Sequence, residues 1–136
     1  MAGNSEHNGT DDSEALLRSM ESERGYIYPA HRYLANAAPE FLRAYNALAG
    51  EALLHGERSD SDVALPGKYR ELVVSGILAF KGAAPESIAV HLRRALELGA
   101  TKQEMLEAFE ASVIPGGAPA MLAGVRALMV LEGTPT

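Results

Sequence analysis

One histidine of this chain stands where it could transfer protons. His91 lies three residues after Ile88 and four before Ala95, which places it on the apolar face of a predicted helix. A histidine on a buried face can act as a general acid or base, because burial tunes its pKa. The alternative is a core histidine that bonds to a backbone carbonyl. Spacing alone leaves both interpretations open.

A second candidate is the pair Arg70 and Glu71, at the start of the most apolar predicted helix, 66–81. A carboxylate that enters such a helix must be paired, solvated near the helix end, or functional. Glu71 and Ser75 are four residues apart and therefore share a face. Taken alone, the pattern favours a structural role, with Glu71 near the positive end of the helix and Arg70 pointing to solvent.

Tyr28 and His31 belong to a third group, within a six-residue stretch that also contains Arg32 and Tyr33. These side chains could line a polar pocket over an apolar core. They could equally form an amphipathic surface turn, which the sequence alone favours. The remaining histidines, His7 and His55, have no local partner.

Several kinds of chemistry are excluded or unexpected. The chain has no cysteine, which excludes disulfides, thiolate metal sites and any cysteine nucleophile. It has no paired histidines at helical spacing, so we expect no metal. Gly116 and Gly117 lack the lysine and hydroxyl residue that complete a phosphate-binding loop. We therefore expect neither metal nor cofactor.

The elements that must position these residues are predicted to be about six helices, or seven segments when a helix interrupted by a break is counted as two. Alternating apolar patterns are absent, and strong helix formers dominate. The expected helical segments are 13–24, 29–36, 39–55, 66–81, 85–98, 101–114 and 119–131, the last two separated by a break over 115–119. Residues 1–11 are expected to be a disordered tail, and 12–133 a single domain. The helix over 66–81 is apolar nearly all round, which predicts burial at the centre of the fold or of an oligomer.

Composition limits the partners. Of the 136 residues, 47% are hydrophobic and 22% charged, the balance of a soluble globular protein. A formal net charge of −6 does not favour binding to nucleic acid or to an anionic membrane, since both are negatively charged. The N-terminal stretch lacks the features of a signal peptide, and no apolar run reaches the ~20 residues of a membrane span. We expect a cytoplasmic protein that binds neither nucleic acid nor membrane.

The second half of the chain carries an ordered set of motifs. In sequence order these are Leu65-Pro66, Arg70-Glu71, an apolar helix ending at Gly82, His91-Leu92-Arg93, and Gly99-Ala100-Thr101 with Glu104. The set resembles the carboxymuconolactone decarboxylase family, which includes the alkylhydroperoxidase D-like proteins. The resemblance implies an all-α fold, in which N-terminal helices accompany an alkylhydroperoxidase D-like core hairpin of helices. It also implies a homo-oligomer, commonly a trimer or hexamer.

The resemblance also separates two branches of this family. The hydroperoxidase branch carries two cysteines before its histidine, and these positions fall here on Ala84 and Ser87. Peroxide reduction needs a thiolate, so thiol peroxidase activity is not expected. The family histidine matches His91 and the family glutamate best matches Glu71. The cysteine-less, decarboxylase-like branch is the closer match.

That branch releases CO2 from a carboxylated muconolactone without a cofactor. The chemistry needs a cation for a substrate carboxylate, and an acid that protonates carbon. We expect His91 as the acid and Glu71 as its partner. Substrate binding is expected from Arg70, His31, Tyr28 and Ser87, with Arg93 or Arg94 of a neighbouring subunit as other candidates for the cation.

The predicted function is cofactor-free decarboxylation of a small carboxylated lactone from aromatic ring-cleavage metabolism. Two alternatives stay open. One is another proton-transfer reaction on the same scaffold, such as isomerisation or lactone hydrolysis. The other is a non-catalytic oligomer that binds a small molecule or a partner protein. An enzyme should bring His91 and Glu71 together in a pocket, whereas a structural role should leave His91 bonded to backbone in a dry core.

Overall fold

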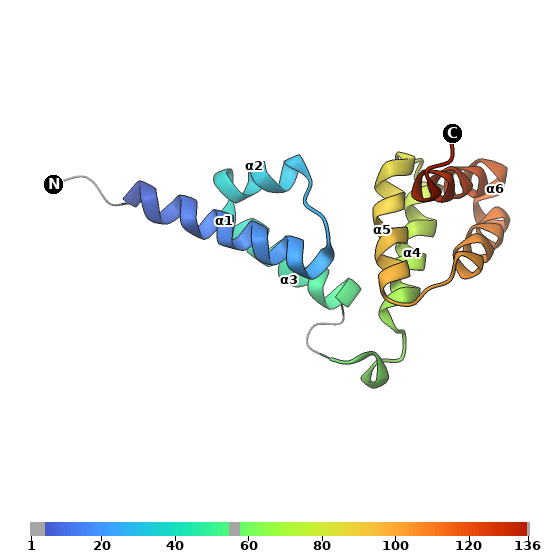
Figure 1. Ribbon diagram of the computed structural model, residues 1–136, viewed down its shortest axis with the longest axis horizontal. Helices are drawn as coiled ribbons and strands as arrows, with labels where there is room; N and C mark the ends of the chain where they lie inside the picture. The colour runs from blue at the N-terminus through green and yellow to red at the C-terminus, as the bar shows by residue number, and fades with distance from the viewer. Residues whose placement is uncertain (1–4, 55–57, 136) are drawn as a thin grey trace. The chain divides into compact units, whose positions relative to one another are not determined.

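The computed structural model describes residues 5–54 and 58–135, and these fall into two compact units, 1–56 and 57–136 (Figure 1). His55 lies outside the described residues, as does the side chain of His7. The described residues are helical, with six α-helices and no strand among them. This confirms the expected all-α class. The single domain over 12–133 stays a prediction.

The N-terminal unit contains three helices, α1 (Ser5–Arg24), α2 (Pro29–Ala37) and α3 (Pro39–Leu54). Both α2 and α3 begin with proline, which suits the first turn because its missing N–H is not needed there. The core of the unit consists of four buried residues, Leu17, Met20, Ala35 and Leu42. These residues come from all three helices, so each helix contributes a face to one small core.

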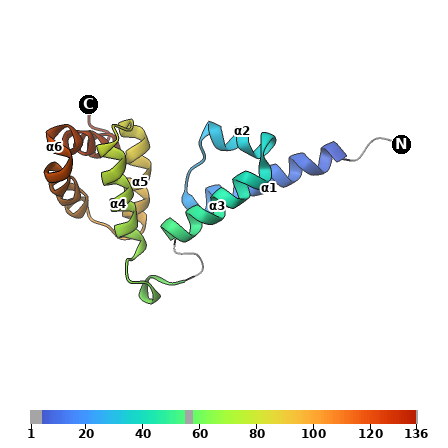
Figure 2. The same cartoon turned by 180° about the vertical axis from the view of Figure 1, so that it is seen from behind.

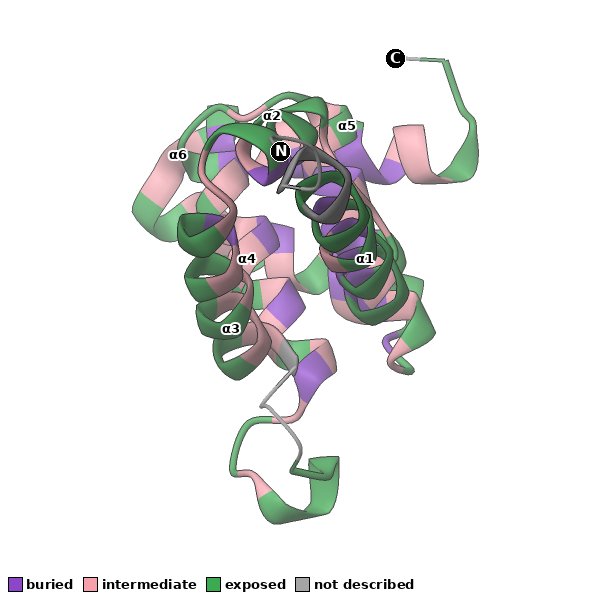
Figure 3. Ribbon diagram, turned by 90° about the vertical axis from the view of Figure 1, so that its left-hand side faces the viewer, coloured by how far each residue is buried: buried purple, intermediate pink, exposed green. Residues whose placement is uncertain are grey.

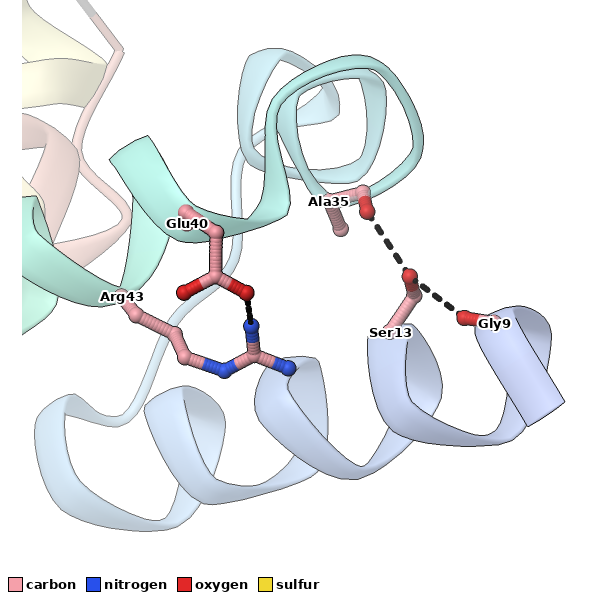
Figure 4. A network of polar contacts seen from close by, with 5 residues as sticks. All are labelled: Gly9, Ser13, Ala35, Glu40 and Arg43. Carbon is pink, nitrogen blue, oxygen red and sulfur yellow. Dashed lines mark hydrogen bonds and ion pairs between the residues drawn. The ribbon is translucent and has the colours of Figure 1, made fainter.

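Helix α1 extends further toward the N-terminus than the pattern predicts. It begins at Ser5 and continues through Gly9, a residue that weakens helix interiors. Ser13, which we expected near the helix start, is instead buried within the helix. Its hydroxyl lies 2.9 Å from the carbonyl oxygen of Gly9 and 2.7 Å from that of Ala35 in α2 (Figure 4). This contact ties the first half of α1 to α2.

The C-terminal unit begins with a short 3₁₀ turn, η1 (Asp60–Asp62), followed by α4 (Gly67–Phe80), α5 (Pro85–Glu97) and α6 (Lys102–Glu132). All three α-helices contact one another, and Figure 2 shows them side by side. Their shared core includes Ile88, Leu92, Met105, Phe109 and Ala127. The expected capping box starts α6, since Thr101 Oγ1 accepts from the Glu104 N–H at 3.0 Å.

Helix α6 contains the expected break. Gly117 has φ 71°, a left-handed conformation that interrupts the helical backbone between Pro115 and Pro119. Among the described helices, α6 alone has the length and apolar composition that crossing a membrane requires. Its buried Met105 and Phe109 belong to the core of this unit.

Helix α4 is not buried on all sides within this unit, so burial at the centre of the fold is wrong, whereas burial in an oligomer stays a prediction. Its buried positions recur once per turn at Gly67, Glu71, Ser75 and Ala79 (Figure 3). The opposite face is exposed within this unit although it is apolar: Tyr69 is 39%, Val73 53%, Ile77 55% and Phe80 63% exposed. The small and polar face thus packs inward, because α5 and α6 both approach α4 from that side. We call the exposed set the α4 apolar stripe.

Candidate functional site

Two of the candidate residues meet at the contact between α4 and α5. The Oε2 atom of Glu71 lies 2.8 Å from Nδ1 of His91. Both residues are buried, with 2% of Glu71 and 8% of His91 exposed. The two positions are twenty residues apart in sequence, so the helix hairpin is what brings them together. We call them the Glu71–His91 pair.

The composition of α4 explains how the carboxylate fits into this interface. One turn after Glu71, Ser75 has a small side chain that allows α5 to approach closely. The Ser75 hydroxyl donates to the Glu71 carbonyl oxygen at 2.8 Å, so it has a partner within its own helix. On α5, His91 is flanked by the fully buried Ile88 and Leu92. The apolar core therefore holds both helices around the pair.

The geometry fixes which nitrogen of His91 handles a proton. An ionised carboxylate only accepts hydrogen bonds, so the Nδ1 that faces Glu71 carries a hydrogen. In the neutral ring Nε2 is then the basic atom, and in the imidazolium form Nε2–H is the acid. The ring is bonded to a carboxylate, not solely to backbone as a structural histidine would be. A carboxylate partner also holds the imidazole ring in one orientation, as acid–base sites require.

Two other candidates of this unit, Ser87 and Arg70, are close to the pair in sequence. Ser87 is four residues before His91 on α5, so the two share a helix face. Arg70 is adjacent to Glu71 in sequence and therefore points to a different side of α4. Its Nε donates to the Leu65 carbonyl at 2.9 Å, which ties the side chain back to the start of the helix.

Tyr28 and His31 belong to the N-terminal unit, where they contact each other. The Tyr28 N–H donates to Nδ1 of His31 at 3.1 Å, and their ring centroids are 5.4 Å apart. His31 is only 6% exposed, so the surface-turn interpretation is wrong for this residue. Burial, and then the nearby Arg24, lower the pKa of His31. Burial, and then Tyr45, raise the pKa of Tyr28, whereas Arg24 lowers it.

Sequence reasoning missed two members of this cluster, Arg24 and Tyr45. The Arg24 guanidinium lies 5.8 Å from the ring centroids of both Tyr26 and Tyr45, a cation–π distance. The ring of Tyr45 is 6.2 Å from that of His31. In the sequence, Tyr45 lies within the expected helix 39–55 and Arg24 at the end of the expected helix 13–24. No local pattern connects α1 to α3, so only the folded unit reveals the cluster.

Two cavities of the C-terminal unit are lined by other residues. A groove of about 450 Å³ between α4 and α6 is bordered by the α4 apolar stripe, with Ser112 and Pro115 opposite. A second hollow of about 410 Å³ lies between the α4–α5 turn and the kink of α6, and Arg126 is its charged residue. Neither Glu71 nor His91 lines these two cavities. Across the described residues, no cluster of three potential ligands for a metal occurs.

The chain is thus an all-α protein in which a helical hairpin buries a carboxylate–histidine pair. The family model of the carboxymuconolactone decarboxylase family matches residues 39–129, so the chain belongs to that family. The match begins at Pro39 and thus includes α3, which lies before the motifs that suggested the resemblance.

A solved structure supports the same assignment. It is the crystal structure of a protein from Burkholderia xenovorans LB400 that is provisionally named a carboxymuconolactone decarboxylase. The TM-score is 0.67 and the sequence identity is 27%, over 94% of this chain and 99% of that chain. A comparison with curated proteins finds no match.

Proposed function

We propose that this protein decarboxylates a small carboxylated lactone, similar to 4-carboxymuconolactone, by acid–base chemistry without a cofactor. The observation that carries the proposal is the 2.8 Å contact between Glu71 Oε2 and His91 Nδ1 in a buried interface. Family membership supports the reaction class. The absence of cysteine from the sequence argues against the thiol chemistry of the hydroperoxidase branch.

In the proposed reaction, the bond between the ring carbon and the departing carboxylate breaks and CO2 leaves. The electron pair of that bond moves into the conjugated lactone carbonyl and gives a dienolate. The Nε2–H of the His91 imidazolium then protonates the dienolate carbon, which yields the enol-lactone. Glu71 stabilises the imidazolium before transfer and holds the ring in place. Solvent returns the proton to His91 after product release.

The other assignments form part of the same proposal. Arg70 would hold a remaining carboxylate of the substrate, since a guanidinium can bind a carboxylate through two parallel hydrogen bonds. Ser87 would contribute a polar contact from the same face of α5 as His91. The protein would act as a cytoplasmic homo-oligomer, a trimer or hexamer. The exposed α4 apolar stripe supports an oligomer, because monomeric proteins rarely expose large contiguous apolar patches.

The decisive experiment is a proton NMR time course with 4-carboxymuconolactone in D2O. We expect CO2 release and incorporation of deuterium at the protonated carbon. His91→Ala should be at least ~100-fold slower, the size expected for loss of a general acid. Glu71→Gln should also be slower, whereas Glu107→Gln should match the wild type, because Glu107 is exposed on α6. A wild-type protein that leaves the lactone unchanged would refute the decarboxylase proposal.

A second candidate function is small-molecule binding without catalysis. It is favoured by the position of the 450 Å³ groove, which is apolar and is not lined by the Glu71–His91 pair. Isomerisation or lactone hydrolysis on the same scaffold would still require the pair. The variants separate these cases, because a ligand that binds in the groove should be insensitive to His91→Ala.

A further inference from the structure

The N-terminal unit buries a cation without a carboxylate beside it. Arg24, the last residue of α1, is only 7% exposed. Its Nη2 donates to the amide oxygen of Asn46 at 2.6 Å, a neutral partner. Within residues 5–54 and 58–135, no carboxylate forms an ion pair with this guanidinium. Buried charges are ordinarily paired, because removing them from water is strongly unfavourable. The Asn46 amide N–H also donates to Glu23 Oε2 at 3.4 Å, so this carboxylate is linked to Arg24 only through the neutral amide.

Aromatic rings surround this guanidinium. The centroids of Tyr26 and Tyr45 are each 5.8 Å from its central carbon, and Tyr26 and Tyr28 lie 5.1 Å apart. Ring faces attract a cation and also pack against flat ligands. They do not provide a hydrogen-bond acceptor in the plane of the Arg24 guanidinium. A guanidinium has five N–H groups arranged as a planar fork. The cluster therefore positions a donor fork among flat apolar surfaces.

His31 adds another donor to the cluster. Its Nδ1 accepts from the Tyr28 N–H, so in the neutral ring the hydrogen is on Nε2. The titratable and charged groups that face this ring are Arg24 from α1, Tyr26 and Tyr28 from the connection, and Tyr45 from α3. None of these four carries a negative charge at neutral pH. The cluster therefore combines one buried cation with neutral hydrogen-bond donors.

We propose that Arg24, His31 and the three tyrosines around them, Tyr26, Tyr28 and Tyr45, form a binding site for a small planar carboxylate. The guanidinium provides the charge and the bidentate geometry, and the rings contact the flat body of the ligand. The inference goes beyond the proposed reaction and stands on contacts within the N-terminal unit alone.

The test uses the full-length protein and benzoate as the probe, with benzamide as its neutral isostere. Ring resonances of the four histidines are followed by NMR, and the resonance of His31 is assigned by its loss in His31→Gln. Benzoate should shift the His31 resonance in a saturable manner, and benzamide should not. Bound benzoate should also raise the pKa of His31, because a negative charge stabilises the imidazolium form.

Variants of two arginines on the same helix provide the matched comparison. Arg24→Gln should weaken benzoate binding at least ~10-fold, as expected for loss of a charge-assisted bidentate contact. Arg24→Lys keeps the charge without the fork and should be weakened as well. Arg18→Gln should bind like the wild type, because Arg18 is exposed on α1.

Three outcomes would overturn the proposal. Equal shifts with benzoate and benzamide would show that charge is not recognised. A response at His91 and not at His31 would place the ligand elsewhere. Equal losses in Arg18→Gln and Arg24→Gln would indicate a nonspecific charge effect. The wild-type comparison is decisive even if Arg24→Gln fails to fold, and it involves no turnover, so it is independent of the decarboxylation assay.

Discussion

The carboxylate of Glu71 and the imidazole of His91 meet at 2.8 Å across the α4–α5 contact, and both side chains are almost entirely removed from water. A buried carboxylate is unfavourable unless it is paired, and here the histidine is its partner. The same contact is also the arrangement that sets the tautomer of a catalytic histidine. Stability and proposed chemistry therefore depend on the same two atoms.

The first prediction concerns the free energy of unfolding of the pair variants. Glu71→Ala should lower it by about 1–3 kcal/mol, the cost of leaving the buried Nδ1 of His91 without its hydrogen-bond partner. Replacing both residues with alanine should cost less than Glu71→Ala and His91→Ala added together, because the double variant leaves no unpaired polar group. Urea unfolding of the wild type, the two single variants and the double variant gives the coupling free energy between Glu71 and His91. Strictly additive changes would mean that Glu71 and His91 do not interact in solution.

The second prediction concerns close packing within α6. A Cβ atom at Gly124 would lie 2.0 Å from the ring of Phe109, which is fully buried. Gly124→Ala should therefore destabilise the protein by about 1–3 kcal/mol through overpacking. Gly76→Ala is the matched control, because a Cβ there meets nothing within 4 Å and alanine favours the helix interior. Thermal unfolding should show a lower Tm for the first variant only.

Most of the helices could be predicted because their boundaries are local. Pro29, Pro39 and Pro85 mark helix starts, and Thr101 with Glu104 marks another through a capping box. The break at Gly117 was predictable for the same reason. The start of α1 was not, because the turns before Ser13 depend on its contact with Ala35 in a different helix.

The candidate site was predictable only where motif order encoded it. His91 and Glu71 were chosen through the family resemblance, since spacing by itself favoured a structural role for the glutamate. Arg24 had no such signal, because its partner Asn46 is twenty-two residues away. The sequence also did not predict which face of α4 packs into the core. A helix with apolar residues on every side does not reveal that Ser75 faces inward and Ile77 outward.

The third prediction tests the α4 apolar stripe as a contact between subunits. Ile77 is 55% exposed, so Ile77→Lys should leave the helical content of the protein unchanged. If the stripe is covered by a second copy, a buried lysine there should dissociate the oligomer. Light scattering coupled to gel filtration would measure the mass. Ala111→Lys, at an exposed position of α6, is the control and should keep the mass of the wild type. An unchanged mass for Ile77→Lys would exclude the stripe from the interface.

The last prediction is a pH dependence that arises from His31. Burial, followed by Arg24, lowers the pKa of this residue in the folded protein below its ordinary value of 6.5. Below pH 6.5 His31 therefore binds a proton in the unfolded chain but not in the folded protein. The free energy of unfolding falls as the pH falls toward the lowered pKa. Above pH 6.5 neither state binds this proton, so His31 does not make the free energy of unfolding depend on pH there.

His31→Gln isolates this effect. Glutamine at this position can still accept a hydrogen bond from the Tyr28 N–H, as in an ordinary capping box, but it does not titrate. The free energy of unfolding of wild type and variant, measured in urea from pH 7.5 to 5, should differ by a constant above pH 6.5. Below that pH the wild type should lose stability faster than the variant. Parallel curves over the whole range would contradict the prediction, because they would mean that His31 titrates equally in both states.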